Sequence, residues 1–230
     1  MSLSQDRPTN PAKFFLKIKS GAVSYYDKDT QENIAVPTPF EFIVLDQLAT
    51  IKGWSDADES GFWSNEVRSI GKDIVNVRTS KGTKESGIWR DIKGSPELAG
   101  AKYNTSVYIA HQSRNGMIIS NIAFSGASLK AWIEFSQKNR VNNCKVVLSD
   151  WLDAKKGRVE YQVPVFEAMK MTEAEREEAI ELDKQLQVYL NEYFNYASND
   201  AHGEEKQEVI EDVALEDIDD KPIDLSEIPF

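Results

Sequence analysis

The chain has 230 residues, a formal net charge of −11, an apolar fraction of 40% and a single cysteine. This length provides one good core, or one domain with appendages, and a single cysteine excludes an internal disulfide framework. No apolar run approaches the roughly 18 residues of a membrane span, and the N-terminus lacks an apolar signal-peptide stretch, so we expect no membrane association and a cytoplasmic location.

Short runs of alternating or β-branched residues, separated by Gly, Asn and Asp, predict a mainly β protein. The run from Phe40 also permits a helix over 41–49, but the prolines before it and Lys52-Gly53 after it favour a strand. In chain order, the expected strands are Phe14–Lys19, Ala22–Tyr26, Phe40–Ile51, Phe62–Arg68, Asp73–Thr79, Gly87–Ile92, Ala101–His111, Met117–Phe124, Cys144–Leu148 and Arg158–Phe166.

Two helices are expected among these strands. Ser125–Ser128 can cap a helix over about 129–138. Thr172 and Glu175 form a capping box that opens a helix to about Tyr196. We therefore divide the chain into a domain over 1–171, a helix over 172–198 that packs on this domain or on a second copy, and a disordered tail over 199–230.

This order of elements favours a decorated OB-fold, which is a five-stranded oligonucleotide-binding barrel, here with extra strands and loops. The helix after Ser128 would then lie between the third and fourth barrel strands. A β-sandwich is the alternative, and the pattern of strands does not separate the two.

The charge is divided very unevenly along the chain. Residues 199–230 hold twelve acids against Lys206 and Lys221, a net charge of −10. The remaining body has 26 acids and 25 bases, a net charge of −1. Within the body, residues 1–162 are more basic, because another acidic cluster lies over 173–183. A mildly basic domain therefore carries an acidic appendage.

Groups that could support catalysis are sparse, and we expect no enzyme, no cofactor and no metal site. His111 stands alone on a strand and His202 lies in the tail, while one cysteine and two histidines cannot build a structural zinc site. Asp46, Glu66 and Asp73 could hold Mg²⁺ in a nuclease, which is a distant alternative.

Aromatic residues interleaved with bases are the stronger signal, because rings stack on unpaired bases while Lys and Arg follow the phosphates. Neighbours on a strand point to opposite faces, so one of Phe62 and Trp63 should be exposed. The candidate DNA-binding residues are Lys52, Trp54, Phe62, Trp63, Arg68, Arg78, Lys81, Lys84, Trp89, Arg90, Lys93, Lys102, Tyr103 and Tyr108.

The last residues, Ile228-Pro229-Phe230 behind a series of acids, closely resemble the tip of bacterial single-stranded-DNA-binding proteins. The aspartate run of that family is broken here by Leu225, Ser226 and Glu227, and the body lacks a bacterial core signature. The chain, including its stretch Pro39–Trp63, therefore looks like a bacteriophage-type single-stranded-DNA-binding protein. The resemblance assigns a partner-binding tip to Asp217, Asp219, Asp220, Asp224, Glu227, Ile228, Pro229 and Phe230.

The resemblance implies a protein that coats single-stranded DNA, with weak sequence preference, during replication, recombination and repair. Its tip would recruit replication and recombination proteins, and its location would be the host cytoplasm if a phage encodes it. An acidic tail can also occupy a basic groove until DNA displaces it. The alternative from another class is an acidic scaffold or DNA mimic that binds a DNA-processing enzyme directly. The sequence leaves the oligomeric state open.

Overall fold

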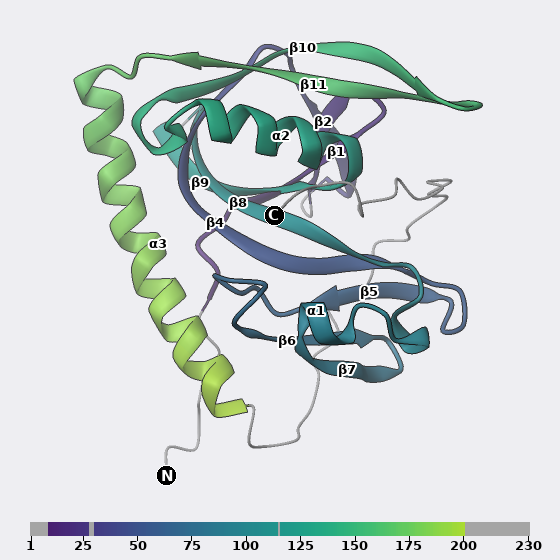
Figure 1. Cartoon of the computed structure of the whole chain (residues 1–230). Helices are drawn as coiled ribbons and strands as arrows, with labels where there is room; N and C mark the ends of the chain where they lie inside the picture. The colour runs from purple at the N-terminus through teal and green to yellow at the C-terminus, as the bar shows by residue number, and fades with distance from the viewer. Residues whose placement is uncertain (1–8, 28–29, 115, 201–230) are drawn as a thin grey trace.

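A computed structural model describes residues 9–27, 30–114 and 116–200, with the backbone course alone for 196–200 (Figure 1). The predicted mainly β class is confirmed. The strands are β1 (Phe14–Lys19), β2 (Ala22–Asp27), β3 (Glu32–Val36), β4 (Phe40–Ser55), β5 (Ser60–Ser64), β6 (Ile74–Thr79), β7 (Gly82–Ile88), β8 (Ala101–Ser113), β9 (Gly116–Phe124), β10 (Lys145–Lys156) and β11 (Val159–Met169). The helices are α1 (Trp89–Ile92), α2 (Gly126–Lys138) and α3 (Glu173–Asp200), with short 3₁₀ turns at Pro96–Leu98 and Val141–Asn143.

All eleven strands belong to one mixed sheet. Nine follow the order β3-β2-β1-β9-β8-β4-β5-β6-β7, and β10, which pairs with β11, branches from it at β4. The β1–β9 pair is parallel, and the other pairs are antiparallel. One edge of β4 pairs with β8, while its other edge pairs with β10 near Phe40 and with β5 near Ser55. The sheet therefore forks at β4, as the separate upper and lower strands of Figure 1 show.

Within the described residues, no pairing joins the outer strands β3, β7 and β11 to one another, so the sheet is open. The five-stranded barrel that the element order favoured is thus not confirmed. Periodicity in a sequence reports which face of a strand is buried, but barrel closure depends on pairing between distant strands.

The upper core lies between the sheet and α2. Trp132 of α2 is almost fully buried and stacks on Phe124 with ring centroids 4.7 Å apart. Its indole Nε1 donates to Gln47 Oε1 at 2.9 Å, so the polar edge of this ring is satisfied. Ser125 and Ser128 form the capping box that begins α2, close to the predicted start.

The lower core fills the space between β4–β7 and α1. Ile51, Phe62, Val75 and Val77 are its buried centre, and Trp89 of α1 packs against them half-buried. The predicted strand over 87–92 is wrong in its second half, because the chain turns at Trp89 into α1.

Helix α3 packs on the sheet face opposite α2. Leu186, Tyr189 and Leu190 cover Leu48 and Tyr108. The predicted capping box is confirmed: Thr172 and Glu175 exchange backbone and side-chain hydrogen bonds of 2.8–3.2 Å. Among the described residues, no helix has the length and apolarity that a membrane span needs.

Candidate nucleic-acid interface

Strand register gathers bases and exposed aromatic rings on the α3 side of the sheet. Lys52 of β4 lies opposite Lys102 of β8 on one edge and opposite Trp63 of β5 on the other. Trp63 in turn lies opposite Arg78 of β6. Directly opposite residues point to the same face, so these four side chains form one row across the sheet.

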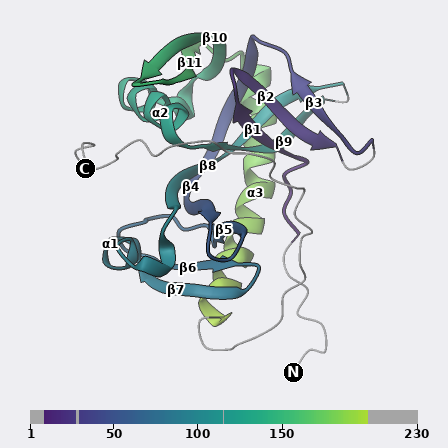
Figure 2. The same ribbon diagram turned by 90° about the vertical axis from the view of Figure 1, so that its right-hand side faces the viewer.

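The same face continues onto β1. Lys17 pairs with Ala123 of β9, and Ala123 pairs with Ser106 of β8, which lies four residues from Lys102 and shares its face. Strand alternation adds Phe15 and Lys19 beside Lys17. We call Phe15, Lys17, Lys19, Lys52, Trp63, Arg78 and Lys102 the basic face. Figure 2 shows how β1 and β5–β6 lie on either side of β8 and β4.

The two largest rings of the basic face are accessible to a ligand. Phe15 is 55% exposed and Trp63 is 37% exposed. Trp54, at the end of β4, shares this side of the strand and is 40% exposed. Large apolar side chains at such exposure are available for stacking, whereas a buried ring is not.

The bases of this face act on one another electrostatically. The pKa of the Lys52 ammonium lies below its usual value, chiefly because surrounding protein desolvates it; Glu66 opposes this shift and Lys17 adds to it. Strands β9 and β8 lie between Lys17 and Lys52, and the positive charge of Lys17 nevertheless disfavours protonation of Lys52. A polyanion placed here would relieve their repulsion.

The acid beside these bases is turned toward the protein. The Glu66 carboxylate accepts hydrogen bonds from Ser106 and from the Tyr108 hydroxyl, the latter at 2.8 Å. The backbone N–H of Glu66 donates to the Tyr193 hydroxyl of α3 at 2.8 Å. This network holds Tyr193 of α3 beside the basic face, in which Arg78 and Lys102 are half-buried and the other five residues are exposed.

A close backbone approach fixes the row near its end. Gly100 has φ +94°, and a Cβ at this residue would lie 2.2 Å from the carbonyl oxygen of Trp54. A side chain would therefore separate β4 from the segment that leads into β8. Glycine here keeps Lys52 and Lys102 adjacent.

Some of the predicted DNA-binding residues lie in the core. Phe62 is 3% exposed and Tyr108 is fully buried, so neither ring can receive a base and we remove both from the interface. Tyr103 is half-buried between the two cores, with its hydroxyl 3.1 Å from Thr105 Oγ1. The alternation argument itself is confirmed, because Trp63 is the exposed member of its pair with Phe62.

Three other predicted basic residues do not belong to the basic face, one because of its partners and two because of their position. Arg68 Nη1 lies 3.1 Å from Asp46 Oδ2, and its guanidinium stacks 5.0 Å from the centroid of the Phe194 ring of α3. Arg90 and Lys93 are exposed near α1. Because α1 packs on the face of β6 opposite Arg78, these two bases lie away from the basic face.

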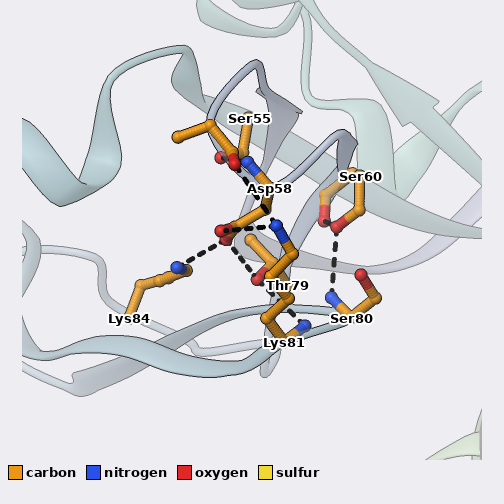
Figure 3. Close-up of polar contacts among 9 residues, drawn as sticks. Ser55, Asp58, Ser60, Thr79, Ser80, Lys81 and Lys84 are labelled. Atoms are coloured by element: carbon orange, nitrogen blue, oxygen red, sulfur yellow. Dashed lines mark hydrogen bonds and ion pairs between the residues drawn. The ribbon is translucent and has the colours of Figure 1, made fainter.

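Lys81 and Lys84 converge on Asp58, a buried carboxylate between the β4–β5 and β6–β7 turns (Figure 3). Lys84 Nζ and Thr79 Oγ1 each lie 2.6 Å from Asp58 Oδ2, and Lys81 Nζ lies 3.7 Å from Oδ1. The hydrogen bonds from Lys84 and Thr79 hold the pKa of Asp58 below its usual range. Lys84, with 19% of its side chain exposed, therefore joins two hairpins together.

Sequence reasoning missed the β1 residues of the basic face. Phe15, Lys17 and Lys19 alternate with Phe14, Leu16 and Ile18, so the sequence does contain a basic strand face. The sequence pattern does not reveal that β1 pairs with β9, and this pairing places the basic strand face on the same side of the sheet as Lys102.

The three acids of the nuclease alternative do not meet. Asp46 binds Arg68, Glu66 binds Ser106, and Asp73 accepts from the backbone N–H of Ser69. Within the described part of the chain, no group of three potential ligands could hold a metal ion. The partner-binding tip at 217–230 lies outside the described residues.

No protein family model, no curated protein and no solved structure matches this chain.

Proposed function

We propose that this protein is a non-enzymatic single-stranded-DNA-binding protein and that the strand lies across the basic face. The observation that carries the proposal is the row Lys102, Lys52, Trp63 and Arg78, in which an exposed aromatic ring lies among basic side chains. Each stacked base contributes about 1–3 kcal/mol, and phosphate neutralisation adds affinity with little sequence preference.

The tail supplies the second half of the proposed function. With a net charge of −10 over 199–230, it competes with DNA for the basic face and is released when DNA binds. The tip that ends in Phe230 then recruits replication, recombination and repair proteins, as its resemblance to single-stranded-DNA-binding proteins implies. A phage origin and a cytoplasmic site of action belong to the same proposal.

Titration of a labelled oligo-dT at about 50 and 200 mM salt tests DNA binding directly. If Lys17, Lys52, Arg78 and Lys102 each neutralise one phosphate, log K falls with log salt at a slope of about −3, a loss of roughly 50-fold in affinity across this range. Absence of dT binding at low salt, with the tail present or removed, would exclude the proposal. It would favour the scaffold or DNA mimic, which binds a partner protein without DNA.

Substitutions locate the binding surface. Lys17→Gln and Lys102→Gln should each reduce the slope by about 0.7, because one phosphate contact is lost. Lys93→Gln is the matched control: it makes the same Lys→Gln change at an exposed residue on the opposite side of the lower strands. Equal effects of all three substitutions would mean that binding follows net charge rather than this face.

A further inference from the structure

The β10–β11 hairpin extends well beyond the body of the molecule. Residues Lys145–Leu148 of β10 pair with both β4 and β11, but from Asp150 to Lys156 the strand pairs with β11 alone. Figure 1 shows this part projecting at the upper right. A two-stranded hairpin is marginally stable by itself in water, so an extended one benefits from a partner surface.

One face of the projecting hairpin is apolar. Register places Leu152 opposite Val163 and Ala154 opposite Tyr161, with Val159 following on the same face. Leu152 is 60% exposed and Val159 is 38% exposed. The other face is directed at the body: Trp151 packs on the upper core, and Gln162 lies against the Gly21 turn. We call Leu152, Ala154, Val159, Tyr161 and Val163 the hairpin face.

The tip of this hairpin is basic. Lys155 Nζ pairs with Glu160 Oε1 at 2.7 Å. Lys156 and Arg158 are exposed, and within the described residues neither forms an ion pair. The tip therefore presents two unneutralised positive charges beside the hairpin face.

A groove of complementary character lies between α3 and the start of β9. It has a volume of about 590 Å³, an apolar floor of Met117, Ile180 and Leu182, and a rim of Glu177, Glu178 and Glu181. Glu181 pairs with Lys184 at 2.6 Å, whereas Glu177 and Glu178 have no ion pair among the described residues. Ile180 is 47% exposed, so the floor is open to a ligand.

We propose that the hairpin face and basic tip of one copy bind the acidic groove of the next copy, head to tail. Both surfaces belong to one chain, and they match in character: apolar against apolar, and Lys156 and Arg158 against Glu177 and Glu178. The hairpin projects on the side of the molecule opposite α3 (Figure 1), so the hairpin face and the groove of one copy cannot bind each other. A heterologous contact of this kind produces an open chain of subunits.

The contact is small, and its size determines when it acts. Five apolar side chains fall far short of the 20–30 residues a side of a stable interface. Free copies therefore associate weakly, while copies held side by side on one strand meet at high effective concentration. This role rests on the proposed function, because the bound strand aligns the subunits and the contact makes coating cooperative.

The test compares a short oligo-dT that holds one copy with a dT strand several times longer. The tip variant carries Lys156→Glu and Arg158→Glu, and the groove variant carries Glu177→Lys and Glu178→Lys; all four side chains are exposed, so folding is preserved. Each variant should bind the short oligo with unchanged affinity but lose about tenfold in cooperativity on the long one. A protein with all four substitutions should regain cooperativity, and Glu192→Lys, on α3 outside the groove, should leave it unchanged.

Sedimentation velocity without DNA gives an independent readout. The wild type should sediment faster as its concentration rises, without reaching a closed oligomer, and the tip and groove variants should not. If the protein does not bind dT, the proposed function fails, but sedimentation still decides whether the contact exists. The inference is overturned if the tip variant loses affinity for the short oligo as strongly as for the long one, which would make the hairpin a DNA surface. It is also overturned if the four substitutions together fail to restore cooperativity.

Discussion

The neighbours Phe62 and Trp63 allow stability and the proposed DNA binding to be tested separately within one dipeptide. Phe62 points into the lower core and is 3% exposed, whereas Trp63 points to the basic face and is 37% exposed. Trp63→Ala should therefore reduce oligo-dT affinity by about 1–3 kcal/mol, or roughly 5- to 150-fold, because one stacked base is lost. It should change the unfolding free energy little, because a partly exposed ring buries less apolar surface.

Phe62→Ala should show the opposite pattern. Removal of a buried Phe costs about 3–5 kcal/mol of stability through lost transfer energy and the cavity that remains. DNA affinity of the fraction that stays folded should change little. Fluorescence anisotropy with labelled dT and urea unfolding of the same two variants separate these effects. If Trp63→Ala binds dT like the wild type while remaining folded, the strand does not stack on this face.

Three further predictions follow from charge and from the tail. Oligo-dT affinity of the wild type should fall as the pH rises through the lowered pKa of Lys52, because the neutral amine no longer neutralises a phosphate. Lys52→Arg should flatten the profile, and an unchanged profile would remove Lys52 from the site. Deletion of 199–230 should raise dT affinity, and weaker DNA binding by this truncated protein would refute the competing-tail proposal. Deletion of Phe230 alone should leave dT affinity intact and abolish capture of partner proteins. The Glu175 pKa is lowered to about 2, chiefly by the hydrogen bond from Lys145, so its stabilising effect is complete above about pH 4.5 and is lost as the pH falls toward 2. Thermal unfolding across this window should therefore show a smaller pH dependence for Glu175→Gln than for the wild type.

The local sequence pattern predicts much of the secondary structure, because helix capping and strand alternation depend on residues that are close together in the chain. Thr172 with Glu175, Ser125 with Ser128, and the opposite orientations of Phe62 and Trp63 all follow from spacing along the chain. The short strand β3 and the turn into α1 were missed, since neither has a clear periodicity over so few residues.

The candidate site could be predicted only in part, because it depends on pairing between distant strands. Nothing local tells that β1 runs parallel to β9 and brings Lys17 toward Lys52. The sequence also does not distinguish a lysine that faces solvent from one that forms a buried ion pair, as Lys84 does with Asp58. The same limit explains why the order of elements favours an OB-fold barrel although the sheet is open and forked.

Strand β4 contributes to both cores, with Phe42 and Val44 in the upper one and Ala49 and Ile51 in the lower one. The two halves of the molecule therefore cannot lose their structure separately, because disorder in either one removes a strand from the other. A ligand that crosses from β1 to β6 then meets a surface whose two ends are already fixed relative to each other. If that ligand is single-stranded DNA, as proposed, the entropy lost on binding comes mainly from the flexible DNA and little of it from the protein.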